Sequence, residues 1–325
     1  MVFKRLLGSL GVGGPTVDTV LDPGAARPGG ALTGRVHLEG GSADFDIEHI
    51  ALELVARVEA EHEEGESRGT VAFERFVVGG GFRLAAGEER SVPFSVTLPW
   101  ETPVSELYGQ PLGIVLGVRT ELSVAGARDK GDLDPLTVAP LPTQEAVLEA
   151  LGRLGFGFAS ADLEYGRIGG TGQRLPFYQE IELTPAPQYA HQVNEIELTF
   201  LAHPGGVEVV LEADKRGGFL SAGQDALTRF TVGHHDARDW VQEVDGWIRR
   251  LVEHRESYGS PALYGHHGQD GHPEGHRSGP GVGTAVAAGA AGLAVGVVGG
   301  MVAAEVVDEV GDLFEGDEDD EGGED

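Results

Sequence analysis

The sequence predicts a mainly β protein built from two tandem antiparallel β-sandwiches. Short apolar runs with a period of two, separated by glycine and proline, fill residues 14–138; a helical pattern interrupts them at 143–154; alternating runs resume after 156. A period of two places successive side chains on opposite faces of a strand. At 325 residues the chain is long enough for two domains, each with its own core.

The first predicted domain covers residues 1–140. Its clearest strand contains Val92, Phe94, Val96 and Leu98, which alternate with polar residues. Further runs of the same kind occupy residues 17–21, 32–38, 50–58, 71–78 and 114–120. About seven short strands in such a length are typical of a β-sandwich.

A connecting helix is predicted within residues 141–155. Apolar side chains fall at helical spacing from Ala146 to Leu154, directly after Pro140 and Pro142. We expect Thr143 to be its N-cap, because a threonine oxygen can accept a hydrogen bond from an N–H group of the first turn. This helix separates the two predicted domains.

The second predicted domain covers residues 156–258. Phe177, Gln179, Ile181 and Leu183 share one side of a strand, and two further alternating runs follow at 196–200 and 207–213. The strand-forming part, residues 156–232, is short for a complete sandwich. We therefore expect it to share surface with the segment that follows.

That segment predicts an amphipathic helix at about residues 236–258. Its apolar stripe contains Trp240, Val241, Val244, Trp247, Ile248, Leu251 and Val252. Trp240, Trp247 and Leu251 could form a face for a partner protein, or they could dock on the domain itself. Intramolecular docking is the usual fate of such a stripe in a globular protein.

The carboxyl end divides into three segments: a linker rich in histidine, glycine and proline at 259–280, an uncharged apolar segment at 281–304, and an acidic tail at 305–325 that we expect to be disordered. The apolar segment is long enough to cross a bilayer, but glycine and alanine dominate it. Within it, Gly292, Gly296 and Gly300 have the spacing that lets two helices approach closely. The alternatives are self-association into a homo-oligomer, insertion in the inner membrane, and a low-complexity tail.

The composition excludes several classes of partner. With 53 acidic and 23 basic residues, the net charge of −30 repels nucleic acid and anionic lipid. We therefore expect a basic or polar protein partner. There is no cysteine, and residues 1–14 lack the apolar core and cleavage site of a signal peptide, so the expected location is cytoplasmic.

One segment matches a catalytic motif in its residue types but not in its expected structural context. Residues 65–69 match the G-x-S-x-G pattern of a serine hydrolase, with Ser67 as the nucleophile. That pattern needs a strand that turns into a helix, whereas here we expect a turn between two antiparallel strands. A hydrolase is therefore an alternative that the context disfavours, and no catalytic residue is predicted.

No metal or cofactor site is predicted. Five histidines lie close together, at positions 254, 266, 267, 272 and 276, but their spacing matches no closed four-ligand pattern. Acidic pairs two residues apart, such as Glu180 with Glu182 and Glu195 with Glu197, point to one side of a strand. They predict an acidic outer face.

Taken in order, short segments along the chain resemble the bacterial sporulation-control protein M family. They lie at 3–7, 13–19, 28–30, 34–36, 40–41, 154–156, 175–180 and 211–216. The resemblance covers about residues 1–247 and leaves out the linker, the apolar segment and the acidic tail. It implies a pair of arrestin-like sandwiches and no catalytic residue.

The same resemblance implies a regulatory function. It points to a non-enzymatic adaptor or scaffold that controls the onset of sporulation or morphological development through binding of another protein. In arrestin-like folds partners dock along the sandwich surfaces and the seam between domains. A membrane-associated structural protein of the envelope is the remaining alternative.

Overall fold

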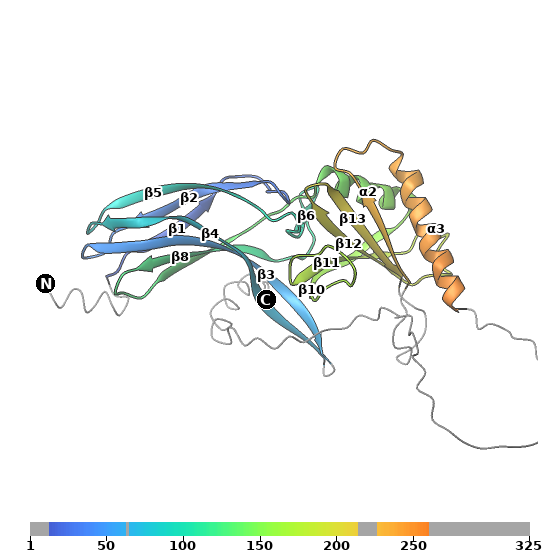
Figure 1. Ribbon diagram of the computed structural model, residues 1–325, viewed down its shortest axis with the longest axis horizontal. Helices are drawn as coiled ribbons and strands as arrows, with labels where there is room; N and C mark the ends of the chain where they lie inside the picture. Colours follow the sequence, from blue (N-terminus) through green and yellow to red (C-terminus); the bar gives the residue numbers. More distant parts are fainter. Residues whose placement is uncertain (1–12, 63–64, 214–225, 260–325) are drawn as a thin grey trace, which may run out of the picture.

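The prediction of a mainly β fold is confirmed. A computed structural model describes residues 13–62, 65–213 and 226–259, and within these ranges strands form several sheets accompanied by two helices, α2 and α3 (Figure 1). The strands of the first half are β1 (Thr16–Leu21), β2 (Ala31–Glu39), β3 (Phe45–His62), β4 (Gly65–Leu84), β5 (Glu89–Thr97), β6 (Glu106–Leu107), β7 (Gln110–Pro111), β8 (Leu116–Val124) and β9 (Lys130–Pro135). The elements of the second half are α2 (Pro142–Leu154), β10 (Gly157–Tyr165), β11 (Phe177–Thr184), β12 (Ile196–His203), β13 (Gly206–Ala213), β14 (Ala226–Val232) and α3 (Trp240–Gly259).

The first half is a β-sandwich. One layer has the strand order β1-β2-β5, and the other contains β4, β3, β8 and β9. Alternate residues of both layers are buried between them, including Val36 on β2 and Leu52 and Leu54 on β3. A buried hydrogen bond between the hydroxyls of Thr19 and Thr120, 2.6 Å apart, joins the layers at their edge.

The hairpin of β3 and β4 extends beyond this sandwich and reaches the second half (Figure 1). β3 pairs with β8 along residues 47–56 and, further along, pairs in parallel with β10 at Glu59 and Glu164. Two register shifts in the β3–β4 ladder increase its twist and disturb the free edge of β4. One hairpin therefore carries both halves of the molecule.

The second half is a sheet with the order β10-β11-β12-β13-β14, covered on one face by α2 and α3. Inward-facing residues such as Ile196, Leu198 and Val209 pack against Val147 and Leu151 of α2 and Trp247 of α3. The layer opposite this sheet is thus helical, where the sequence pattern favoured a second sheet. The apolar stripe of α3 supplies the surface that a second sheet would have provided.

The first residues of α2 and α3 differ from those predicted from the sequence. Leu141, not Thr143, is the N-cap of α2, and its N–H donates to the side chain of Gln144 at 2.8 Å. The Thr143 hydroxyl instead donates to the carbonyl of His234, 3.1 Å away. In α3 the Asp239 carboxylate accepts from the N–H of Gln242 at 3.2 Å, so the helix starts four residues later than position 236.

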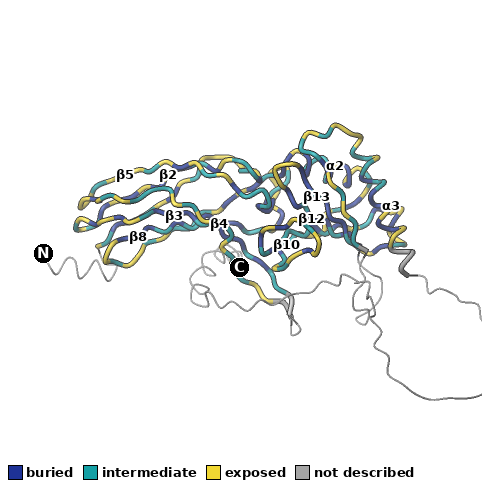
Figure 2. The backbone as a smooth tube through the Cα atoms, in the orientation of Figure 1, coloured by how far each residue is buried: buried dark blue, intermediate teal, exposed yellow. Residues whose placement is uncertain are grey.

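Side chains join the two halves at their seam. The amide of Gln179 on β11 accepts from the N–H of Val104 and donates to its carbonyl, at 2.9 and 2.8 Å. The carboxylate of Glu101 accepts from the N–H groups of Arg174 and Leu175. Buried residues continue from one half into the other (Figure 2). These contacts fix the position of the second sheet relative to the first.

Several predictions concern residues outside the described ranges. They include Gly292, Gly296 and Gly300, the apolar segment 281–304, the tail 305–325, and the histidines at 266, 267, 272 and 276. Neither helix in the described part of the chain is long and apolar enough to cross a membrane.

A candidate acidic pocket on the C-terminal sheet

The outer face of the second sheet carries a concentration of carboxylates. Both described helices lie on the opposite face, where alternate residues of β11 to β14 are buried. The intervening residues point outward and are acidic on four adjacent strands. They are Asp162 and Glu164 on β10, Glu180 and Glu182 on β11, Glu197 on β12, and Glu208 and Glu212 on β13.

The strand register places these carboxylates opposite one another. Glu182 pairs with Glu197, Glu197 pairs with Glu212, and Asp162 pairs with Glu180. Like charges directly opposite on neighbouring strands destabilise a sheet. This arrangement lowers stability and therefore calls for a functional explanation.

One cluster on strands β3, β4 and β8 of the first sandwich shows a different pattern. There the Arg75 guanidinium lies 3.2 Å from Glu53 and 3.0 Å from Glu121, and Arg119 also pairs with Glu53. Cross-strand charges in that cluster are therefore of opposite sign. A like-charged pair also occurs in the first sandwich, where Glu39 lies opposite Glu89. The second sheet differs because its carboxylates continue across four adjacent strands.

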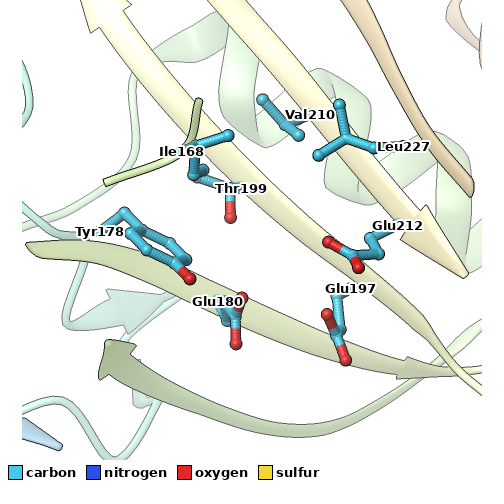
Figure 3. Close-up of a pocket in the computed structure, with 8 residues that line it drawn as sticks. All are labelled: Ile168, Tyr178, Glu180, Glu197, Thr199, Val210, Glu212 and Leu227. Atoms are coloured by element: carbon cyan, nitrogen blue, oxygen red, sulfur yellow. The ribbon is translucent and has the colours of Figure 1, made fainter. Parts of the chain in front are cut away.

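A small hollow lies among these carboxylates. Glu180, Glu197 and Glu212 line it together with Tyr178, and Figure 3 shows their oxygens turned toward one space. The opposite wall is apolar and consists of Ile168, Val210 and Leu227. Its volume of ≈ 20 Å³ is room for about one water-sized group. The hollow thus combines an apolar wall with an anionic one.

Thr199 forms the floor of this hollow. Its side chain is only 4% exposed, and its hydroxyl oxygen points into the hollow (Figure 3). Within the described residues this hydroxyl has no hydrogen-bond partner. Because its oxygen faces the hollow, this hydroxyl can accept a hydrogen bond from a group that enters that space.

Burial and mutual repulsion change the ionisation of the pocket. Burial, followed by the charges of Glu197, Asp162, Glu164 and Glu212, raises the pKa of Glu180 to about 9. Burial and the nearby Glu180 carboxylate also raise the pKa of the Tyr178 hydroxyl. Both groups are therefore held largely in their neutral forms at neutral pH.

Three of the carboxylates are close enough to share a cation. One oxygen each from Asp162, Glu164 and Glu180 lies within 4.8 Å of the other two. Hard divalent cations bind through carboxylate oxygens of this kind. The expectation of no metal site stays a prediction, because exposed acidic groups often approach one another without a metal.

The loop 166–176 holds one side of the pocket in place. Ile168 from this loop packs on Leu201 and Val210 of the sheet. The buried Gln173 side chain accepts from the Ile168 N–H at 2.8 Å, and its two amide hydrogens are shared among the carbonyls of Gly166, Leu175 and Phe177. Arg229 on β14 donates to the carbonyl of Gly170 and ties the loop to the edge of the sheet.

A second cleft, of ≈ 190 Å³, lies where β8 and β10 diverge beside β3. Its charged lining residues are Arg57, Glu59, Arg68 and Asp162. The Nε atom of Arg68 donates to Glu59 at 2.8 Å, and Arg57 and Asp162 also interact with neighbouring groups. This cleft thus contains charges of both signs, whereas the charged residues that line the acidic pocket are all acidic.

The aromatic stripe of α3 faces the protein interior. Trp247 and Leu251 are 1% and 0% exposed, and the Trp247 ring stacks on Phe230 of β14 at 4.8 Å. Trp240 is partly buried and contacts Trp247 edge to face. These residues therefore dock on their own sheet, which leaves no free aromatic face for a partner on this side of the helix.

Ser67 lies in a different setting from the one expected. Strand β4 begins at Gly65, so Ser67 is an exposed residue within this strand, where it pairs with Ala60. No helix follows it before residue 142 in the described chain. The strand-turn-helix geometry that positions a hydrolase nucleophile is therefore not present at this serine.

The sequence indicated only part of the pocket. The acidic pairs at 180 and 182 and at 195 and 197 predicted an acidic outer face, and Glu180 and Glu197 lie there. Asp162 and Glu164 were missed because β10 was not recognised as a strand. The available signal was the alternation in Ala161, Leu163 and Tyr165, which a bulge next to Phe158 interrupts.

These features define a mainly β protein of two joined units with an acidic pocket on the second sheet. Comparison with known proteins places the chain in a family. Residues 3–217 match the family described as SpoOM protein. The chain is also 38% identical over 256 residues to the "Sporulation-control protein spo0M" of Bacillus subtilis, covering 78% of this chain and 90% of that protein. The chain belongs to the sporulation-control protein M family.

A solved structure agrees with this assignment. The crystal structure of Spo0M from Bacillus subtilis has a TM-score of 0.60 and 33% sequence identity to this chain. The match covers 76% of this chain and 98% of that one. The resemblance noted in the sequence is thus confirmed.

Proposed function

We propose that this protein is a regulatory adaptor in the control of sporulation, and that it acts by holding a partner protein on the outer face of its C-terminal sheet. The observation that carries this proposal is the acidic pocket, which lies on the face of the sheet opposite both described helices. The control of sporulation comes from the printed name of the Bacillus subtilis relative.

The charge of the chain supports a protein partner of basic or polar surface. A net charge of −30 attracts positively charged surfaces over long range and repels nucleic acid and anionic lipid. The carboxylates of the second sheet make its outer face the part of the described surface to which a positively charged partner should be attracted most strongly. A cytoplasmic partner is consistent with a chain that has no cysteine.

A non-enzymatic mechanism is part of the proposal. The one catalytic motif of the sequence lies within strand β4, and the next helix in the described part of the chain begins only at Pro142. The alternative of a membrane-associated envelope protein depends on residues 281–304, outside the described ranges, and stays a prediction. Homo-oligomerisation through Gly292, Gly296 and Gly300 also stays a prediction.

A photo-crosslinking amino acid at two exposed positions tests where a partner docks. Thr231 on β14 lies on the outer face of the second sheet, opposite Glu208, and His37 on β2 is exposed on the first sandwich. In developing cells, the probe at position 231 should capture one discrete protein and the probe at 37 should not. Equal products from both positions would contradict docking at this face.

A blocking substitution tests whether that contact matters. A Thr231→Trp variant places a bulky ring on the outer face, whereas His37→Trp makes the same change on the first sandwich. We expect only the first to alter the timing of sporulation, with both proteins present at normal levels. Unaltered timing in both strains would remove the adaptor proposal.

A further inference from the structure

Two properties of the acidic pocket indicate the chemistry of its ligand, apart from the carboxylates themselves. The first is the buried Thr199 hydroxyl, which points into the hollow and has no partner among the described residues. The second is the apolar wall formed by Ile168, Val210 and Leu227. A hydrated metal ion would bind through the carboxylates. It would gain nothing from the apolar wall and would not need the hydroxyl.

We propose that this pocket binds the side-chain ammonium group of a lysine from the partner protein. The inference rests on the proposed adaptor function and names the chemistry by which the partner is recognised.

The acceptors in the hollow match the donors of an ammonium group. An ammonium group has three N–H donors and no acceptor. The carboxylates of Glu197 and Glu212, which pair across β12 and β13, and the hydroxyl of Thr199 are acceptors turned toward the same space (Figure 3). An ammonium ion there would donate to the Thr199 hydroxyl and offset the repulsion between the two glutamates.

The apolar wall matches the rest of a lysine side chain. A lysine buries its four methylene groups along apolar surface while its charged end reaches a polar group. Ile168, Val210 and Leu227 provide such a surface on one side of the hollow. A ligand with both an aliphatic stem and a compact charge therefore fits the two walls together.

The size of the hollow favours lysine over arginine. A hollow of ≈ 20 Å³ admits a compact group of about the size of one water molecule. A guanidinium is planar and broad and binds best to carboxylates that it approaches edge-on in a fork. The ammonium is thus the better occupant of this space.

Titration with short peptides tests the inference on the full-length protein. The probes are tetralysine with an acetylated N-terminus, the same peptide with all four side chains also acetylated, tetra-arginine with an acetylated N-terminus, and calcium chloride. The readout is the methyl NMR signals of Val210 and Leu227, which lie in the apolar wall. We expect tetralysine to shift both signals to saturation, tetra-arginine to bind at least about fivefold more weakly, and the peptide with acetylated side chains to have no effect.

Three variants make the test specific. Thr199→Val removes the hydroxyl at nearly constant shape, and Glu197→Gln removes one charge. Each should weaken tetralysine binding about tenfold, as expected for the loss of a charge-assisted hydrogen bond. Glu39→Gln, an exposed change on β2 of the first sandwich, should leave binding unaltered. Because the Thr199 hydroxyl has no partner, Thr199→Val should fold normally, so loss of binding cannot be ascribed to unfolding.

The outcomes separate this inference from the adaptor proposal. Equal shifts with side-chain-acetylated tetralysine, stronger binding of tetra-arginine, or displacement of tetralysine by calcium at equal concentration would overturn the lysine assignment. So would full retention of binding in Thr199→Val. If the lysine assignment fails but crosslinking at position 231 still captures a partner, the adaptor proposal stands. The pocket then recognises a group other than a lysine ammonium on that partner.

Discussion

The rings of Trp100 and His234 stack across the seam between the two halves, with centroids 4.9 Å apart and planes inclined by 27°. Trp100 follows β5 in the first half, and His234 lies between β14 and α3 in the second. The indole also lies against Gly29, where an added Cβ would come within 2.5 Å of it. The tryptophan therefore fills a slot between a loop of one half and the core of the other.

We expect Trp100→Ala to destabilise the protein by about 3 kcal/mol, because truncation of a packed tryptophan leaves a cavity and removes its contacts. Urea unfolding followed by circular dichroism measures the change in the free energy of unfolding. Tyr108→Ala provides the control, since the Tyr108 side chain is 63% exposed. Equal losses in the two variants would show that Trp100 is not a structural link.

Gly29→Ala should destabilise by about 3 kcal/mol or more, since the added methyl group would collide with the Trp100 ring at a backbone φ of +69°. Gly24 provides a matched control. Its φ is +109°, yet nothing lies within 4 Å of an added Cβ, so Gly24→Ala carries only the backbone strain of about 1 kcal/mol.

The combination Gly29→Ala with Trp100→Ala tests the cause of that loss. If the collision is responsible, the double variant should lose clearly less stability than the sum of the two single variants, since removal of the ring relieves the clash. Additive losses would assign the effect of Gly29→Ala to its backbone alone.

Asp134 on β9 makes the first sandwich sensitive to pH. Its Oδ2 atom is buried without a hydrogen-bond partner in the described chain, and burial, followed by the charges of Asp132 and Asp18, raises the pKa of Asp134 to about 6. Because the folded value exceeds the ordinary value of 3.8, its stabilising contribution is complete below pH 3.8 and is lost as the pH rises through about 6.

We therefore expect Asp134→Asn to be more stable than the natural protein at pH 7.5, by about 1–2 kcal/mol after allowance for solvent screening. The difference should shrink toward zero at pH 4. Urea unfolding at both pH values measures it, with Asp22→Asn at an exposed loop position as the control. A pH-independent difference would show that Asp134 does not titrate as described.

Periodicity in the sequence located most strands and both helices, because alternation and helical spacing are local properties. It did not identify what covers the second sheet, since the stripe around Trp247 shows only that this face must be buried. The pocket was equally out of reach. Thr199, Val210 and Leu227 lie on different strands, and only the register of β12, β13 and β14 brings them together. Local sequence patterns do not show which strands, separated along the chain, pair with one another.

Glu180→Gln should make the folded protein more stable and weaken its binding to lysine. Burial, followed by the surrounding carboxylates, raises the pKa of Glu180 to about 9 from 4.5, so the stability that its neutral form provides is complete below pH 4.5 and is lost as the pH rises through about 9. A glutamine has the same shape and stays neutral at every pH. We expect the variant to be more stable than the natural protein by about 2 kcal/mol at pH 8, with little difference at pH 4.5. Unfolding curves at the two pH values measure this, with Glu74→Gln at an exposed position of β4, opposite Leu54, as the control. The same variant should bind tetralysine more weakly, because Glu180 lines the pocket and can lose its proton when an ammonium group is bound there, whereas glutamine cannot. A variant that gained stability and kept full lysine binding would show that Glu180 takes no part in recognition, whereas a loss of stability at pH 8 would show that the natural carboxylate is not under repulsion in the folded protein.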